Sequence, residues 1–568
     1  MTAKPPRPSL PSAHTGRAAR YIALVLEVLW TTLLVLPAAL TTSAMRVFDQ
    51  EPGLLFAVSC WVVLGTRLLF PRRAYFFVTL PVVLLGVACT GAELLRGVDL
   101  LGLLGRWHTF TALEIAGTAR PYAWATLGTC LVLGTLAFAC HRFVPEHTRP
   151  RAVAWGVVAA TALLATAVPR TVWLRTWPID GILLVGATAS GSNVMTQYLF
   201  PELSYVDPRD PGSSWGASRV PGAPAAETVV LLIGETIRPD YLRECGGPAR
   251  VRPLSSGARV ACDVTAGSDG TSESVPLLIS REMPGHRVRV STDATFVHAL
   301  QEAGFEGHWI GVQPRSVAWP DATVQLFRPD RGRDDAVLLP PLATALARPA
   351  PLKAIVLHAN NAHTPYCSRY DRAQAPYPVD CSAGVDAVSP ANLAQVRASY
   401  ANAVDASVGL LDDVIDALSR RPEPTFLVYA PDHGENLLDD GRELWNHALR
   451  RPTRWDARVP VVFWANDAWR AGHAAQWARL ESQLGAPLMH ADLVPTLLDA
   501  AGVRYDEPRK APVDLLASTV PPQRHRIVQQ ALDDALDWTT LEAEARAAGP
   551  GPAASRPDDA RAVVLLPR

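Results

Sequence analysis

The first third of the chain contains five long apolar stretches, which constrain its fold more than any other feature of the sequence. Each is long enough, or nearly so, to cross a hydrocarbon layer of about 30 Å as a helix. The stretches are residues 21–44, 54–70, 75–92, 122–140 and 153–168. The first exceeds the length of a signal-peptide core, and further stretches follow it. The sequence therefore predicts a transmembrane domain of five helices over residues 21–170, after a short N-terminal segment, residues 1–20.

Basic residues between these stretches predict the orientation, because loops rich in Lys and Arg stay in the cytoplasm. The clusters are Lys4, Arg7, Arg17 and Arg20 before the first stretch, Arg67, Arg72 and Arg73 after the second, and His141, Arg142, Arg149 and Arg151 between the fourth and the fifth. The N-terminus is therefore expected in the cytoplasm. An odd number of spans then places everything after Arg170 outside. Glu27, inside the first stretch, is either a structural residue or a contact for a lipid headgroup.

The charges of the 568 residues nearly cancel, since 53 Lys and Arg face 54 Asp and Glu. No global positive field is present, so nucleic acid is not an expected partner. The four cysteines beyond the apolar region form two couples that are close in sequence, Cys245 with Cys262 and Cys367 with Cys381. An oxidising compartment would allow both couples to be disulfides, and free thiols are the alternative.

The remainder of the chain predicts an α/β domain. Residues 171–226 form a linker, rich in Pro, Gly, Ser and Ala after residue 201, and the domain covers residues 227–520. Its strands are short apolar runs, as expected for a mainly parallel central sheet covered by helices. The runs are residues 228–233, 307–311, 354–357, 425–430 and 459–464, and the clearest amphipathic helix is 399–418. Residues 521–568 are expected to be a peripheral or disordered C-terminal extension.

Polar residues follow three of the predicted strands. Glu235 follows the first, His358 and His363 follow the third, and Asp432 and His433 follow the fourth. Ligands bind beyond the carboxyl ends of parallel strands, and carboxylates with an imidazole are suitable ligands for Zn²⁺. Taken singly, each of these residues could instead be a helix-terminal charge or a capping side chain. Their recurrence at corresponding places in one sheet favours a metal site.

A hydroxyl nucleophile is available in the stretch Gly-Ser-Asp-Gly-Thr-Ser-Glu-Ser-Val-Pro, residues 267–276. A Gly-rich turn followed by Thr and Ser would place a hydroxyl at a helix start, where backbone N–H groups favour oxyanions. Metal coordination would activate that hydroxyl. Composition does not choose among Thr271, Ser272 and Ser274, and an ordinary capping turn is the alternative.

These motifs resemble those of the membrane-anchored phosphoethanolamine transferases of Gram-negative inner membranes, within the alkaline phosphatase and sulfatase superfamily. The resemblance covers nearly all of residues 20–520. The string Val-Val-Leu-Leu-Ile-Gly-Glu-Thr-Ile-Arg is similar to the first metal motif of the family and implies Glu235 as a ligand. Gly-Thr-Ser-Glu-Ser-Val-Pro is similar to the nucleophile segment and implies Thr271, which then also binds the metal. Pro-Asp-His-Gly-Glu is similar to the motif that supplies Asp432 and His433.

The resemblance also implies roles for two further histidines. His363 lies in a segment similar to the one that contacts the transferred phosphate, and His447 is similar to a downstream histidine of the family. Arg450, Arg451 and Arg454 could pair with anionic substrate oxygens or form a solvated basic loop.

The chain also departs from the family. Gly267 and Leu277 stand where many members have a disulfide, and the Asn and Lys expected after Trp309 are not evident near Gln313. Thr109, Thr111 and Glu114 are only weakly similar to the family's donor-lipid loop.

The resemblance implies a transfer of phosphoethanolamine from phosphatidylethanolamine through a covalent intermediate on Thr271, with Zn²⁺ as cofactor and diacylglycerol as leaving group. The acceptor would be lipid A, a lipopolysaccharide core phosphate or a glycan. The protein is then a multi-pass inner-membrane protein with a periplasmic catalytic domain, and a monomer is expected. The alternatives are a hydrolase of the same superfamily and a non-catalytic membrane sensor. A sulfatase would have Cys or Ser at position 271, with Pro and Arg where Glu273 and Val275 stand.

Overall fold

The protein is described by a computed structural model, which divides into two compact units. The helical unit comprises residues 1–92 and 123–186, and the C-terminal unit comprises residues 93–122 and 187–568. The structure describes residues 17–41, 52–70, 72–96, 123–144, 151–167, 214–222, 224–285, 294–313, 321–327, 335–381, 388, 390–449, 451–506, 512–530 and 534–552. Thr109, Thr111 and Glu114 lie outside the described residues.

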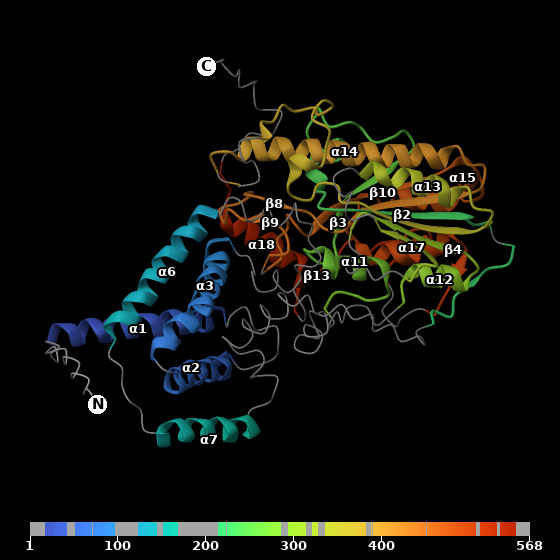
Figure 1. The fold of residues 1–568 in the computed structure, drawn as a ribbon. Coiled ribbons are helices and arrows are strands. Elements are labelled where there is room, and N and C mark those ends of the chain that lie inside the picture. Colours follow the sequence, from blue (N-terminus) through green and yellow to red (C-terminus); the bar gives the residue numbers. More distant parts are fainter. Residues whose placement is uncertain are drawn as a thin grey trace, which may run out of the picture. The chain divides into compact units, whose positions relative to one another are not determined.

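The helical unit has one helix at each of the five predicted stretches (Figure 1). The helices are α1 (Arg17–Thr41), α2 (Pro52–Leu69), α3 (Arg72–Arg96), α6 (Ala123–Phe143) and α7 (Arg151–Ala167). Among the described residues, the segment Trp124–Phe143 is long and apolar enough to cross a membrane. Apolar segments of α1, α2 and α3 are shorter over the described part. The prediction of helices is confirmed, while the number of spans stays a prediction.

Glu27 of α1 forms an ion pair with Arg67 of α2 inside the helical unit. The Arg67 Nε donates to Glu27 Oε1 at 2.6 Å, and the guanidinium also lies over the rings of Tyr75 and Phe76. Charged groups within an apolar bundle are costly unless they are paired. The pairing therefore favours the structural reading of Glu27 over a headgroup contact.

The C-terminal unit is built on an eight-stranded sheet whose strand order is β11-β3-β10-β7-β2-β6-β4-β5. The strands are β2 (Thr228–Gly234), β3 (Arg259–Thr265), β4 (Glu306–Gly311), β5 (Val324–Phe327), β6 (Lys353–His358), β7 (Thr425–Pro431), β10 (Arg458–Ala465) and β11 (Leu488–Met489). All five predicted strands are present. The sheet is mixed, because β10 runs antiparallel to both of its neighbours while the other pairs are parallel.

Helices cover both faces of this sheet, as the apolar runs predict (Figure 1). Val229, Leu231 and Ile233 of β2 join one hydrophobic core, and Val230 and Leu232 join the other. The first core includes α11 (Thr271–Ile279), α12 (Phe296–Glu302) and α17 (Leu493–Ala500); the second includes α13 (Leu339–Leu346) and α14 (Leu393–Ser419). The predicted helix 399–418 lies within α14. Since β2 is buried on both faces, the residues that follow it are held by a rigid support.

Both predicted disulfides are present. Cys245 is bonded to Cys262, which ties a short helical turn to β3, and Cys367 is bonded to Cys381. Of the remaining cysteines, Cys60, Cys130 and Cys140 are free thiols, and all three lie in the helical unit.

The folded part of the C-terminal unit extends beyond the predicted boundaries on both sides. Trp215 is fully buried in the core, and β1 (Ser218–Arg219) pairs with β12 (Val503–Arg504), so residues 214–222 belong to the fold rather than to a linker. At the other end, β13 (Ile527–Gln530), β14 (Asp534–Asp537) and α18 (Trp538–Ala548) are ordered. The expectation of a peripheral or disordered extension is wrong for these residues.

Trp538 anchors this extension, and its removal should destabilise the C-terminal unit. Its side chain is buried with Ala457, Val528 and Leu541. Trp538→Ala should cost about 3–5 kcal/mol of unfolding free energy, because it leaves a cavity the size of an indole. Arg546→Ala, at an exposed position of the same helix, should change the unfolding free energy by less than about 0.5 kcal/mol. The measurement is the melting midpoint of the purified chain, and equal midpoints for the two variants would contradict the assignment.

Candidate active site

Four side chains gather beyond the carboxyl ends of β2 and β7. Glu235 follows β2, Asp432 and His433 follow β7, and Thr271 is the first residue of α11. Because β2 and β7 are neighbouring parallel strands, the residues that follow them lie at the same edge of the sheet. The structure therefore brings together the four residues that the sequence assigns to a metal.

The distances among these residues fit a tetrahedral zinc site. Thr271 Oγ1 lies 3.2 Å from each carboxylate oxygen of Glu235 and 3.2 Å from His433 Nε2. His433 Nε2 lies 3.3 Å from Glu235 Oε1 and 3.5 Å from Asp432 Oδ2. Ligands at about 2.0 Å from a tetrahedral Zn²⁺ are about 3.3 Å apart. Asp432 Oδ2 is also buried without a hydrogen-bond partner, as expected of an oxygen kept for a cation.

The charges of the site also favour a bound cation, because the carboxyl groups of Glu235 and Asp432 are buried together. Burial would raise the pKa of Glu235, but the hydrogen bond and charge of His433 hold it well below its usual range. Burial and the neighbouring Glu235 carboxylate raise the pKa of Asp432 to about 8. His433 lowers the pKa of Glu235 whereas the pKa of Asp432 stays raised, so the groups beside Asp432 do not compensate its negative charge. A divalent cation would compensate both carboxylates.

The two further histidines lie beside this cluster. The His447 ring is 4.2 Å from the ring of His433 and 5.2 Å from that of His363. One ligand atom each of Glu235, His433 and His447 lies within 4.8 Å of the other two. Glu235, His433 and His447 therefore form a further group of side chains that could hold a metal ion.

Glu435 orients the His447 side chain through a contact with its ring. Its Oε1 lies 3.3 Å from His447 Nδ1, and its Oε2 accepts a hydrogen bond from the Tyr366 hydroxyl at 2.8 Å. Burial raises the pKa of Glu435 to about 8. The hydrogen bond to one ring nitrogen fixes the orientation of the imidazole.

Sequence reasoning missed two side chains that hold Glu235. Gln313 Nε2 donates to Glu235 Oε2 at 2.7 Å and to Asn360 Oδ1 at 3.2 Å. Thr236 Oγ1 donates to Glu235 Oε1 at 2.8 Å. Gln313 follows β4, so the strand-end rule used for the other residues could have identified it. No sequence signal identifies the role of Thr236.

Two of the three arginines after His447 lie among the described residues. Arg451 forms an ion pair with Glu544 of α18, and Arg454 lies over the ring of Trp455 at 4.8 Å. Arg450 lies outside the described residues. Arg451 is therefore committed to the C-terminal extension rather than to a substrate.

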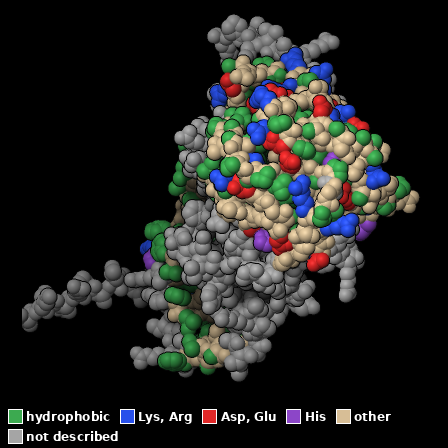
Figure 2. Space-filling view, turned by 90° about the vertical axis from the view of Figure 1, so that its right-hand side faces the viewer, with side chains coloured by type: hydrophobic (Ala, Val, Ile, Leu, Met, Phe, Trp, Pro, Cys, Tyr) green, Lys and Arg blue, Asp and Glu red, His purple; other side chains and the backbone are tan. Residues whose placement is uncertain are grey.

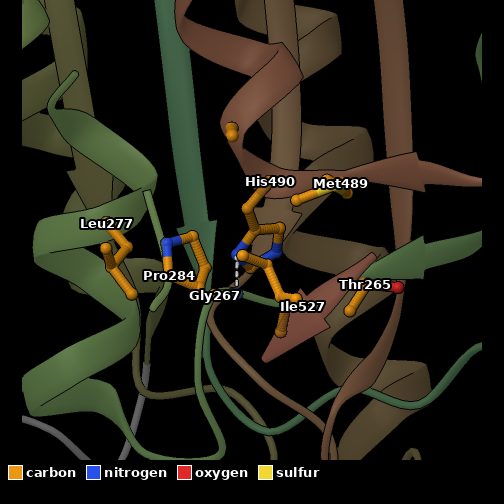
Figure 3. Close-up of a pocket in the computed structure, with 9 residues that line it drawn as sticks. Thr265, Gly267, Leu277, Pro284, Met489, His490 and Ile527 are labelled. Carbon is orange, nitrogen blue, oxygen red and sulfur yellow. Dashed lines mark hydrogen bonds between the residues drawn. The ribbon is translucent and has the colours of Figure 1, made fainter. Parts of the chain in front are cut away.

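The loop before Thr271 is supported by packing instead of a disulfide. A Cβ at Gly267 would lie only 2.9 Å from Leu277 Cβ, so Leu277 fills the space beside the loop. The Gly267 N–H donates to His490 Nδ1 at 3.3 Å, and the Gln529 N–H donates to the Gly267 carbonyl at 2.7 Å. Figure 3 shows His490 pointing to Gly267 across a narrow gap, with Ile527 beside it. The gap has no room for a water molecule, so the support is direct.

Comparison with known proteins identifies the fold. A sequence model described as Sulfatase matches residues 227–503. These residues, just under half of the chain, are therefore similar to sulfatases. Phosphoethanolamine transferase EptC of Escherichia coli strain RS218 is 25% identical over 310 residues, which are 49% of this chain and 51% of that relative. The match thus spans about half the length of this relative.

Two solved structures share the fold of this chain. Lipooligosaccharide phosphoethanolamine transferase A from Neisseria meningitidis, an integral membrane protein, has a TM-score of 0.61 at 17% identity, covering 86% of this chain and 96% of that one. The C-terminal periplasmic domain of EptC from Escherichia coli, in complex with Zn, has a TM-score of 0.50 at 21% identity, covering 57% and 96%. The resemblance to the membrane-anchored phosphoethanolamine transferases is confirmed.

His490 should make the stability of the C-terminal unit sensitive to acid. Burial lowers its pKa to about 3, whereas an unfolded histidine has a pKa of about 6.5. Between these values the unfolded chain binds a proton that the folded chain does not, so His490 lowers stability as the pH falls. His490→Asn keeps an acceptor for Gly267 and removes this titration. Relative to the variant, the parent should lose about 1.4 kcal/mol per pH unit below about pH 6.5.

The check is the difference between the two melting midpoints, followed from about pH 7 to about pH 5. A difference that stays constant with pH would show that His490 does not titrate on unfolding.

Proposed function

We propose that this protein transfers phosphoethanolamine from phosphatidylethanolamine to an acceptor of the cell envelope, through a covalent intermediate on Thr271. The observation that carries the proposal is the position of the Thr271 hydroxyl, 3.2 Å from both Glu235 oxygens and from His433 Nε2 at the start of α11. A helix start also offers backbone N–H groups to phosphate oxygens. The transferase names of the relatives support the choice of phosphoethanolamine.

Glu235, Asp432, His433 and Thr271 would hold Zn²⁺. The ion would lower the pKa of the Thr271 hydroxyl and offset the charge of the phosphate oxygens. The fit rests on the ligand spacing, the unpartnered Asp432 Oδ2 and the excess negative charge.

In the first half of the reaction, Thr271 Oγ1 attacks the phosphorus of the donor, and the bond from phosphorus to the diacylglycerol oxygen breaks. The threonine loses its proton and the departing diacylglycerol oxygen gains one. His363 and His447, whose rings lie 5.2 Å apart, hold phosphate oxygens and relay these protons. In the second half an acceptor oxygen attacks the same phosphorus, and Thr271 regains its hydroxyl. Lipid A, a lipopolysaccharide core phosphate or a glycan hydroxyl could supply that oxygen.

The helical unit supports a membrane location. Large apolar side chains are exposed along its helices, among them Leu24, Val25, Leu131, Val132 and Trp155. Figure 2 shows mainly hydrophobic side chains on these helices, whereas charged side chains of both signs are interspersed over the visible face of the C-terminal unit. We propose five spans in the bacterial inner membrane, a cytoplasmic N-terminus and a periplasmic C-terminal unit. Tethering to the bilayer would raise the effective concentration of a lipid donor.

The covalent step predicts an adduct on Thr271. Incubating the purified full chain with phosphatidylethanolamine should leave phosphoethanolamine on Thr271, detected by peptide mass spectrometry. Thr271→Ala should lack the adduct and lose transfer activity by about 10³-fold or more, because no other group replaces the nucleophile. Ser272→Ala, which removes the adjacent hydroxyl of the same helix, is the matched control and should keep the adduct.

Two other outcomes would contradict the proposal. An adduct on Ser272 or Ser274 would refute the choice of nucleophile. Release of diacylglycerol and free phosphoethanolamine without transfer to any envelope acceptor would indicate a hydrolase of the same superfamily.

The topology predicts that the C-terminal unit can be labelled from outside the inner membrane. Arg546 is exposed on α18, with 67% of its side-chain surface accessible. Arg546→Cys should therefore react with a membrane-impermeant maleimide once the outer membrane has been permeabilised. The parent chain, whose cysteines in the C-terminal unit are bonded in pairs, is the control. Labelling that requires lysis of the inner membrane would place this unit in the cytoplasm.

A further inference from the structure

Thr236, which follows Glu235 directly, has an unfavourable backbone conformation. Its φ is +62°, in the left-handed region, and the residue is fully buried. Four other non-glycine residues of the described chain have positive φ, and none of them is β-branched. For a β-branched residue this conformation is a true outlier with a clear steric cost. Such a cost indicates that the surrounding structure requires the conformation.

The left-handed turn directs two donors of Thr236 to the two carboxylates of the proposed metal site. Its Oγ1 donates to Glu235 Oε1 at 2.8 Å, and its N–H donates to Asp432 Oδ1 at 3.2 Å. The His433 N–H donates to the same Asp432 oxygen at 2.8 Å. Because Oδ1 accepts these two bonds, Asp432 presents Oδ2, which has no hydrogen-bond partner, toward His433 Nε2. Thr236 thus donates a hydrogen bond to each of the two acids.

The neighbouring structure holds this turn from several sides. The Tyr400 hydroxyl of α14 donates to the Thr236 carbonyl at 2.6 Å and accepts the Arg238 N–H at 3.0 Å. On the other side, the Glu235 N–H donates to Asn361 Oδ1 at 3.2 Å. A strained conformation persists only where its surroundings determine it in this way. The turn is therefore built into the packing of α14 and the loop after β6.

We propose that Thr236 is a positioning residue whose strained conformation holds Glu235 and Asp432 in the geometry that binds the metal, with its hydroxyl needed for metal affinity. This inference rests on the proposed function. It assigns to Thr236 no contact with the substrate.

Three substitutions separate the hydroxyl from the backbone strain. Thr236→Ala and Thr236→Gly remove the hydroxyl, whereas Thr236→Ser keeps it. Thr228→Ala is the matched control, because Thr228 is a buried threonine at the other end of β2 whose hydroxyl has no partner among the described residues. Each full-length variant is stripped of metal. Its affinity for zinc is then measured by competition with a chelator, and its metal-free melting midpoint is recorded.

The parent should bind zinc, and Thr236→Ala and Thr236→Gly should bind it about 10–100-fold more weakly, the usual effect of losing a group that orients a ligand. Thr236→Ser and Thr228→Ala should stay within about threefold of the parent. The metal-free midpoint of Thr236→Gly should be at least as high as that of Thr236→Ala, because glycine adopts positive φ without a steric cost.

The inference is wrong if Thr236→Ala and Thr236→Gly bind zinc as tightly as the parent, or if Thr236→Ser loses as much affinity as they do. Should Thr236→Ala fail to fold, the comparison of the Ser and Gly variants decides. A parent chain that takes up no zinc would overturn the proposed metal site as well, and this outcome is distinct because it appears without any substitution.

Discussion

The burial of two carboxylates side by side is the constraint on which the rest of the site depends. Glu235 and Asp432 are fully buried, with His433 between them. Removing one such charge from water costs several kcal/mol unless other groups compensate it. Here compensation comes from hydrogen bonds donated by Thr236, by Gln313 and by the backbone of His433. Neutral donors therefore fix the positions of the two carboxylates, and the His433 imidazole lies against both of them.

The proposed nucleophile, Thr271, is supported by a different part of the chain. Thr271 begins α11 on a loop that is held by distant parts of the chain: His490 and Gln529 bond the backbone of Gly267, and Asp269 accepts the N–H of Leu449 at 3.0 Å. This last contact joins the nucleophile loop to the segment that carries His447. The C-terminal extension, which supplies Gln529, is consequently part of the support of the site. Direct packing performs the role that a disulfide has in many relatives of the resembled family.

Strand periodicity and the residues at strand ends are the sequence signals that located the sheet and the residues beside it. Buried runs such as 228–233 located the strands, and residues directly after them, such as Glu235 and Asp432, are brought together as expected. β3 was not predicted because half-buried polar residues such as Arg259 and Asp263 interrupt its apolar pattern. The role of Thr236 depends on a backbone angle held by a contact with α14, and the folding of residues 527–530 and 534–548 depends on a core completed by Trp538. Both features are determined by tertiary contacts, which periodicity along the sequence does not reveal.

In the proposed function, transfer chemistry and acceptor recognition would depend on different side chains. The side chains proposed for the metal and the nucleophile match the motifs of the resembled family, while the positions after β4 do not. Gln313, a neutral amide, is bonded to Glu235, and Arg451 is paired with Glu544, so neither is placed to add positive charge for an anionic acceptor. In the proposed function the chemistry at phosphorus is the same for every acceptor, so residues outside the four proposed to hold the metal would discriminate among acceptors.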